Sequence, residues 1–233
     1  SEGSATRGGM GRRIKFLLFL MTLHGSLLIT STVAGSKLFA LPFGLTASAT
    51  VVSYMLTFVV LDVIAELYGA EFSRLVINLG LIGMALSALY FKLTIALPPA
   101  AGWPDQAAFA TVFGASWRIW LAGWLAYLAS QYLDLWSFLK IREATRGKAP
   151  ITIRALVGML VGQLFDAVVF LAVAFYASFP LGSTLVGQYV VKVAIAFVGA
   201  LLVWLAVDLG KRWIGRPQSR FARPIGQVLD GFD

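Results

Sequence analysis

The run ITIRALVGMLVGQLFDAVVFLAVAFYA, residues 151–177, decides the fold, because it is apolar and long enough to cross a bilayer yet holds an acid near its middle. That acid, Asp166, lies three residues after Gln163, so both side chains share one helix face. A carboxylate at the bilayer centre costs about 2.5–3.5 kcal/mol on insertion scales. The pattern occurs earlier as QYLD, residues 131–134, and in both copies a phenylalanine follows the acid by four positions. Each predicted helix therefore presents an amide, an acid and an aromatic ring on one face.

The composition is typical of a polytopic membrane protein. Of the 233 residues, 59% are hydrophobic and 13% are charged, and the mean hydropathy is +0.82. These values exclude a water-soluble globular fold. The chain has no cysteine, which excludes disulfides, thiolate metal sites and cysteine nucleophiles. The net charge of +8 does not indicate nucleic-acid binding, because most cations flank apolar runs, where they determine membrane orientation.

Six runs reach the length of about 20 apolar residues that a spanning helix needs. The predicted spans are 14–34, 47–66, 75–97, 116–139, 151–177 and 185–209. A short interfacial helix is expected at 107–114. The sequence thus predicts an all-α membrane protein with one transmembrane domain at 10–213 and a basic cytoplasmic tail at 214–233. Residues 1–9 are interpreted as an expression-vector remnant, because Met10 is typical of a native start.

The cations predict that both termini are cytoplasmic. With that orientation, only Lys37 lies with certainty in an external loop. The cytoplasmic side receives Arg12, Arg13, Lys15, Arg74, Lys140, Arg142, Arg146, Lys148, Lys211, Arg212, Arg216, Arg220 and Arg223. This asymmetry follows the positive-inside rule for an even number of spans.

Polar residues inside the predicted spans are candidates for a transport site. Lys192, early in the last span, lies within reach of Asp166. Two interpretations follow: a buried ion pair that fixes helix register, or a polar cavity for a substrate. Asp62 and Glu66 share one face of the second span, and Asp62 is the deeper of the two. Residues near helix ends are expected to reach headgroups or water, namely Glu66, Lys92, Arg118, Arg154 and Asp208.

Aromatic side chains could cover a planar ligand. Tyr127, Gln131, Asp134 and Phe138 follow one another at helical spacing, so a flat molecule could stack on the rings while its edge bonds the amide and the acid. His24 is the only histidine, which excludes a histidine metal site, and it is expected to be packed and hydrogen-bonded.

Several strings in this sequence resemble the queuosine-precursor transporter family, also called the vitamin uptake transporter family. They are DVIAELYG at 62–69, Arg118 with AY at 126–127, QYLD at 131–134 with FLK at 138–140, GQLFD at 162–166 with Phe170 and AF at 174–175, and YVVK at 189–192. The likeness runs from about residue 38 to 205. Glu66 departs from members that carry a basic residue at that position.

The resemblance implies a six-helix importer of the bacterial inner membrane for 7-deazaguanines, chiefly 7-cyano-7-deazaguanine and its aminomethyl relative. Its plan is similar to the substrate-binding subunits of energy-coupling-factor transporters, but it implies transport without a required ATPase partner and without a cofactor. The substrate-binding residues expected on this basis are Asp62, Tyr127, Gln131, Asp134, Gln163, Asp166, Phe170 and Lys192, with Glu66 and Arg118 as further candidates. The oligomeric state is left open, and a homo-oligomer is compatible with the sequence.

Two other functional classes compete with an importer. An intramembrane enzyme is disfavoured, because the chain lacks H-E-x-x-H and other protease or nucleophile motifs. A binding subunit for another vitamin-like molecule would need a separate ATPase, since no phosphate-binding loop of the G-x-x-x-x-G-K-[ST] type is present.

Overall fold

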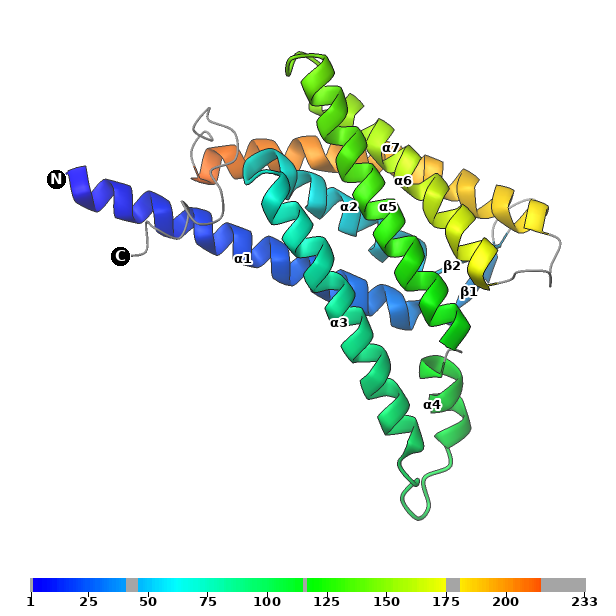
Figure 1. Cartoon of the computed structure of the whole chain (residues 1–233). Helices are drawn as coiled ribbons and strands as arrows, with labels where there is room; N and C mark the ends of the chain where they lie inside the picture. The colour runs from blue at the N-terminus through cyan, green and yellow to red at the C-terminus, as the bar shows by residue number, and fades with distance from the viewer. Residues whose placement is uncertain (1, 41–45, 115–116, 175–180, 215–233) are drawn as a thin grey trace.

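A bundle of long helices makes up the protein (Figure 1). The computed structural model describes residues 2–40, 46–114, 117–174 and 181–214. The elements are α1 (Glu2–Ala34), β1 (Leu38–Ala40), β2 (Thr46–Ser48), α2 (Thr50–Leu67), α3 (Ala70–Ala96), α4 (Gln106–Phe113), α5 (Trp117–Ala144), α6 (Ile151–Ala174) and α7 (Leu181–Ile214). The predicted all-α class is confirmed, and α4 confirms the short helix expected between the third and fourth spans. The end of the predicted fifth span, 175–177, lies outside the described residues.

The sequence analysis did not anticipate the β1–β2 ribbon. These two strands pair antiparallel, with Leu38 opposite Ser48. The second long helix therefore begins at Thr50, whereas its predicted span began at 47.

Five of the long helices in the described part of the chain are apolar enough to cross a membrane. They are Gly11–Ala34, Thr50–Leu67, Ala70–Ala96, Ile151–Ala174 and Tyr189–Ile214. The predicted fourth span corresponds to α5, whose 28 residues exceed the length needed for spanning. Its composition is less apolar, because it includes Arg118, Gln131, Asp134, Lys140 and Arg142. Of these residues, Gln131 and Asp134 are fully buried, so the neighbouring helices must accommodate them.

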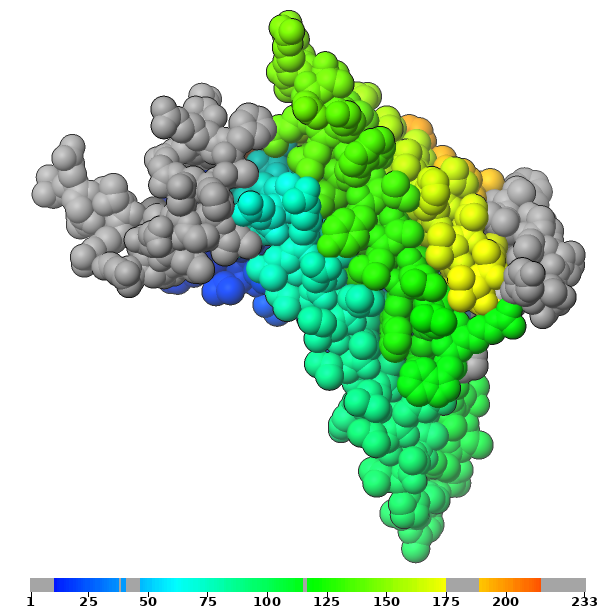
Figure 2. Space-filling model, in the orientation of Figure 1, coloured from blue at the N-terminus to red at the C-terminus, as the bar shows by residue number. Residues whose placement is uncertain are grey.

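Helix α2 lies at the centre of the bundle. It contacts α1, α3, α5, α6 and α7, and 67% of its apolar window is buried, compared with 11% for α3. Together α3 and α4 form an arm that extends beyond the rest of the bundle (Figures 1 and 2). The exposed residues of α3 are mainly leucine, isoleucine and tyrosine, as expected of a surface that faces lipid.

Helices α5 and α6 run antiparallel and form the most extensive helix pair (Figure 1). Glycines allow their close approach: a Cβ built on Gly162 would lie 2.8 Å from the Ser130 carbonyl oxygen and 2.9 Å from a Phe58 ring carbon. Small residues at helix crossings have this role in membranes, where packing replaces the hydrophobic effect between helices.

We expect Gly162→Ala to destabilise the protein by about 1–3 kcal/mol, because the new methyl group meets a backbone carbonyl that cannot rotate away. Gly123 on α5 is a matched control, since a Cβ there meets no atom within 4 Å. Gly123→Ala should instead stabilise by about 0.5–1 kcal/mol through helix propensity. Denaturant unfolding in detergent measures both, and equal effects would contradict the packing argument.

Candidate functional site

The two QxxD helices meet α2 in a set of buried polar contacts. The Tyr54 hydroxyl donates to Asp166 Oδ1 at 3.0 Å and lies 3.1 Å from the Ser130 hydroxyl. The Gln131 amide donates to the Thr57 hydroxyl at 2.9 Å. We call Tyr54, Thr57, Ser130, Gln131, Gln163, Asp166 and Lys192 the polar cluster. The predicted facing of the two glutamine helices is therefore present, and α2 forms a third wall that the sequence analysis missed.

Asp166 has no free oxygen in this arrangement. Its Oδ1 accepts the Tyr54 hydroxyl, and its Oδ2 forms an ion pair with Lys192 of α7. Both side chains are largely buried, with 14% of Asp166 and 10% of Lys192 exposed. The ion pair that the sequence suggested between these residues is thus present. A ligand that used either charge would have to displace or extend this contact.

Each glutamine of the polar cluster leaves its carbonyl oxygen without a partner. Gln131 is fully buried and Gln163 is 2% exposed. The Gln163 amide nitrogen lies 3.6 Å from the Met55 sulfur, a weak acceptor. Neither Oε1 atom has a hydrogen-bond donor among the described residues. Buried unpaired acceptors cost roughly 1–3 kcal/mol each, so a hydrogen-bond donor placed at either oxygen would be stabilising.

Asp134 and Asp62 lie nearer the end of the bundle that carries Arg142 and Arg154. Both are fully buried. An ideal Cβ on Gly158 of α6 would lie 2.5 Å from Asp134 Oδ1, so this carboxyl packs on the α6 backbone. Asp134 and Asp166, which occupy equivalent places in the two repeats, therefore have different surroundings: one is unpaired and the other is ion-paired.

Glu66 joins three helices at that same end. It lies 3.0 Å from Arg154 of α6 and 3.4 Å from Arg142 of α5. The Arg154 guanidinium also stacks over the Phe138 ring, 4.8 Å from its centroid. Arg154 is 5% exposed, which corrects the expectation that it and Glu66 reach headgroups or water. The charges of both are neutralised within the bundle.

Tyr127 turns away from the polar cluster. Its hydroxyl donates to the Ile77 carbonyl of α3 at 3.0 Å and lies 3.2 Å from His24 Nε2 of α1. The expected hydrogen-bonded packing of His24 is thus confirmed. The structure places the Tyr127 ring between α1 and α3, contrary to the idea that it covers a ligand bound at Gln131. Phe170 remains half-buried on α6, and its role as a ring cover stays a prediction.

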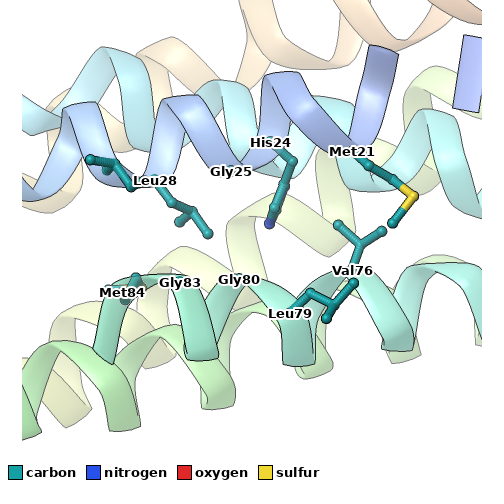
Figure 3. Close-up of a pocket in the computed structure, with 10 residues that line it drawn as sticks. Met21, His24, Gly25, Leu28, Val76, Leu79, Gly80, Gly83 and Met84 are labelled. Atoms are coloured by element: carbon teal, nitrogen blue, oxygen red, sulfur yellow. The ribbon is translucent and has the colours of Figure 1, made fainter. Parts of the chain in front are cut away.

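Two hollows lie beside the bundle core, away from the polar cluster. One, of about 110 Å³, separates α1 from α3 and is lined by His24, Gly25, Gly80 and other residues. Figure 3 shows the His24 side chain directed from α1 toward α3 there. The other, of about 440 Å³, is an apolar groove between α1, α2 and α7. The apolar lining of this groove suits lipid rather than a polar substrate.

The chain matches the model of a protein family described as "Putative vitamin uptake transporter" over residues 48–207. The chain belongs to the vitamin uptake transporter family. It is also 31% identical, over 159 residues, to a protein of Bacillus subtilis (strain 168) named "Probable queuosine precursor transporter". That match covers 67% of this chain and 69% of the relative. No solved structure matches the chain.

Membership in this family makes the chain a multi-pass membrane transporter of a small molecule, and it confirms the prediction that the chain is not an enzyme. The matched region, 48–207, begins before α2 and ends within α7. It therefore contains every residue of the polar cluster, together with Asp62 and Asp134. Helix α1 with His24 lies outside it. The transporter's site is accordingly sought on α2, α5, α6 and α7.

Arg118, a further candidate from the sequence, lies at the opposite end of α5 from Arg142. Its Nε donates to the Val173 carbonyl of α6 at 2.7 Å. In the transporter this contact ties the beginning of α5 to the end of α6. A role in substrate binding for Arg118 stays a prediction.

Proposed function

We propose that this transporter imports 7-deazaguanines, chiefly 7-cyano-7-deazaguanine, and that the base binds at the polar cluster. The observation that carries the proposal is the pair of buried, unpartnered carbonyl oxygens on Gln131 and Gln163. A guanine-like edge presents two adjacent donors, N1–H and the exocyclic amine, which two amide oxygens can accept. The name of the Bacillus subtilis relative supports the same class of substrate.

The remaining groups of the cluster suit the ring carbonyl, which lies next to N1–H on the same edge of such a base. Its ring carbonyl needs a donor, and Lys192 and Tyr54 carry N–H and O–H groups beside the glutamines. The Tyr54 ring stands edge-on to Phe58, with centroids 5.5 Å apart. Tyr54 and Phe170 are the rings that we assign to the faces of the base. The ion pair of Asp166 with Lys192 then opens or lengthens when the base arrives.

We propose that both termini of the transporter face the cytoplasm of a bacterium, across its inner membrane. The cation-bearing ends of the helices gather in the structure: Tyr68, after α2, donates to the Arg13 carbonyl of α1, and Phe16 stacks edge-on with Trp213 of α7. The basic residues at the start of α1 and at the end of α7 therefore lie at the same end of the bundle as the end of α2, which supports this orientation.

The direct test is binding of 7-cyano-7-deazaguanine to the detergent-purified protein, compared with guanine and unrelated vitamins. We expect Gln131→Met and Gln163→Met each to weaken binding by about 5- to 150-fold, the equivalent of a lost buried hydrogen bond. Asn78→Leu is the control, because this exposed residue of α3 bonds only Tyr132 among the interactions described. Unaltered binding by both glutamine variants would contradict the proposed site.

A second candidate function is a binding subunit for another vitamin-like molecule that works with a separate ATPase. The family description favours it, since it names vitamins as a class. Uptake of the base into vesicles that contain only this protein and no ATP would exclude the ATPase requirement. Preferential binding of an unrelated vitamin would favour the second candidate.

A further inference from the structure

Asp62, Asp134 and Arg154 meet where α2, α5 and α6 cross. The register follows from two contacts: Glu66 of α2 pairs with Arg154 of α6, and Asp134 of α5 packs on Gly158 of α6. Helices α2 and α6 run antiparallel in the bundle. Asp62, one turn before Glu66, therefore lies level with Gly158, one turn after Arg154, and so beside Asp134. The electrostatic interaction between the two carboxyls agrees with this placement.

The two acids have no hydrogen-bonding partner in the described part of the chain. All four carboxyl oxygens are buried and unpaired, and so is Nε of Arg154. Besides Asp134, the charged groups that interact with Asp62 are Glu66 of its own helix and Arg154 of α6. Arg154 is already held by Glu66, which also binds Arg142 of α5, while Lys192 of α7 is paired with Asp166. Two ionised carboxylates this close, without water or donors, would be prohibitively unfavourable.

The space between Asp134 and the backbone of α6 is too small for a substrate. The Asp134 carboxyl rests directly on the backbone of Gly158, so even a methyl group at Gly158 would collide with it. A planar base cannot fit between the two. The carboxyls therefore need a ligand of atomic size, and the simplest ligand that neutralises a buried carboxyl is a proton.

We propose that Asp62 and Asp134 form a proton-binding site that couples import of the base to import of protons. This inference rests on the proposed function. In the arrangement described, the pair holds protons and both acids are neutral. When the site opens toward the end that carries Arg142 and Arg154, the protons pass to water, and Arg154 moves its free Nε to the ionised Asp62. Each proton that binds from outside is released inside, so the protons balance and no other reactant is needed.

The proton site can be tested without any substrate. Infrared spectroscopy of the purified protein at neutral pH should show absorption from protonated carboxyls, and Asp62→Asn and Asp134→Asn should each reduce it. Asp208→Asn is the matched control, because this α7 acid is 39% exposed and paired with Arg212. Size-exclusion chromatography verifies that the variants are folded. A spectrum without protonated carboxyls, or one that neither variant changes, would overturn the proposal.

Coupling is tested in vesicles that contain the full chain and unlabelled 7-cyano-7-deazaguanine, with the labelled base added outside. An outside pH one unit lower than inside should raise accumulation of the base by about 100-fold, because two protons accompany each base. We expect Asp62→Asn and Asp134→Asn each to reduce this response to about tenfold, because one proton-binding carboxyl remains, and Asp208→Asn to keep the full response. Exchange without any response in the wild type would overturn the coupling. If the wild type neither bound nor exchanged the base, the proposed function would be wrong. The infrared measurement would still test the proton site, because it needs no substrate.

Discussion

Replacing Lys192 by methionine is expected to abolish uptake and to lower the free energy of unfolding by about 3–5 kcal/mol. The reason is that Asp166 would stay inside the bundle with only the Tyr54 hydroxyl as partner. Breaking one half of a buried ion pair leaves an uncompensated charge, and this is far more costly than removing both halves. Unfolding in detergent and uptake of 7-cyano-7-deazaguanine into vesicles measure the two effects.

The double variant Asp166→Asn with Lys192→Met separates a structural role of the pair from a role in transport. We expect it to regain most of the lost stability, because no unpaired charge remains. Uptake should stay absent, since the lysine donor that we assign to the carbonyl of the base is gone. Recovery of both stability and uptake would show that the pair serves only to fix the register of α6 and α7.

The sequence predicted the helices well because their apolar length is set by the bilayer. It also predicted that Gln131 and Gln163 lie on facing helices, since antiparallel neighbours joined by a short loop pack together. The β1–β2 ribbon was not predicted, because its two three-residue strands are too short to show a recognisable alternation of apolar and polar residues. The six-span topology with cytoplasmic termini stays a proposal, as does the single-domain division at 10–213.

Neutral polar residues of the site are harder to predict from the sequence than charged ones. Tyr54 and Thr57 were not predicted as site residues, because placing a hydroxyl in a membrane helix costs much less free energy than placing a charge there, so hydroxyls do not indicate function. Their spacing from Asp62 and Glu66 along one helix was the available signal. The repeat also suggested equal roles for Asp134 and Asp166. Their difference comes from partners distant in sequence: Lys192 reaches only Asp166, while Gly158 brings the backbone of α6 against Asp134.

Glu66 is the second residue whose removal should have a large effect. Glu66→Gln would remove the carboxylate that pairs with Arg154, a residue with only 6% of its side chain exposed between α2, α5 and α6. We expect a loss of about 3–5 kcal/mol in the free energy of unfolding. Arg142→Gln should cost less, because Arg142 is 24% exposed and Glu66 would keep Arg154.

Two comparisons sharpen this expectation for the Glu66 cluster. Arg154→Lys should also be destabilising, because lysine cannot reproduce the two-nitrogen contact with Glu66 or the stacking on Phe138. Glu143→Gln provides the matched control: its partner Lys140 is 59% exposed, and surface pairs of this kind contribute at most about 1 kcal/mol. Equal unfolding free energies for Glu66→Gln and Glu143→Gln would contradict a buried charge cluster. If only Glu66→Gln and Arg154→Lys lowered the free energy of unfolding, the guanidinium of Arg154 would have to be desolvated, because an exposed guanidinium depends much less on its anion. Arg154 is the cation that we assign to Asp62, so this result would also support that assignment.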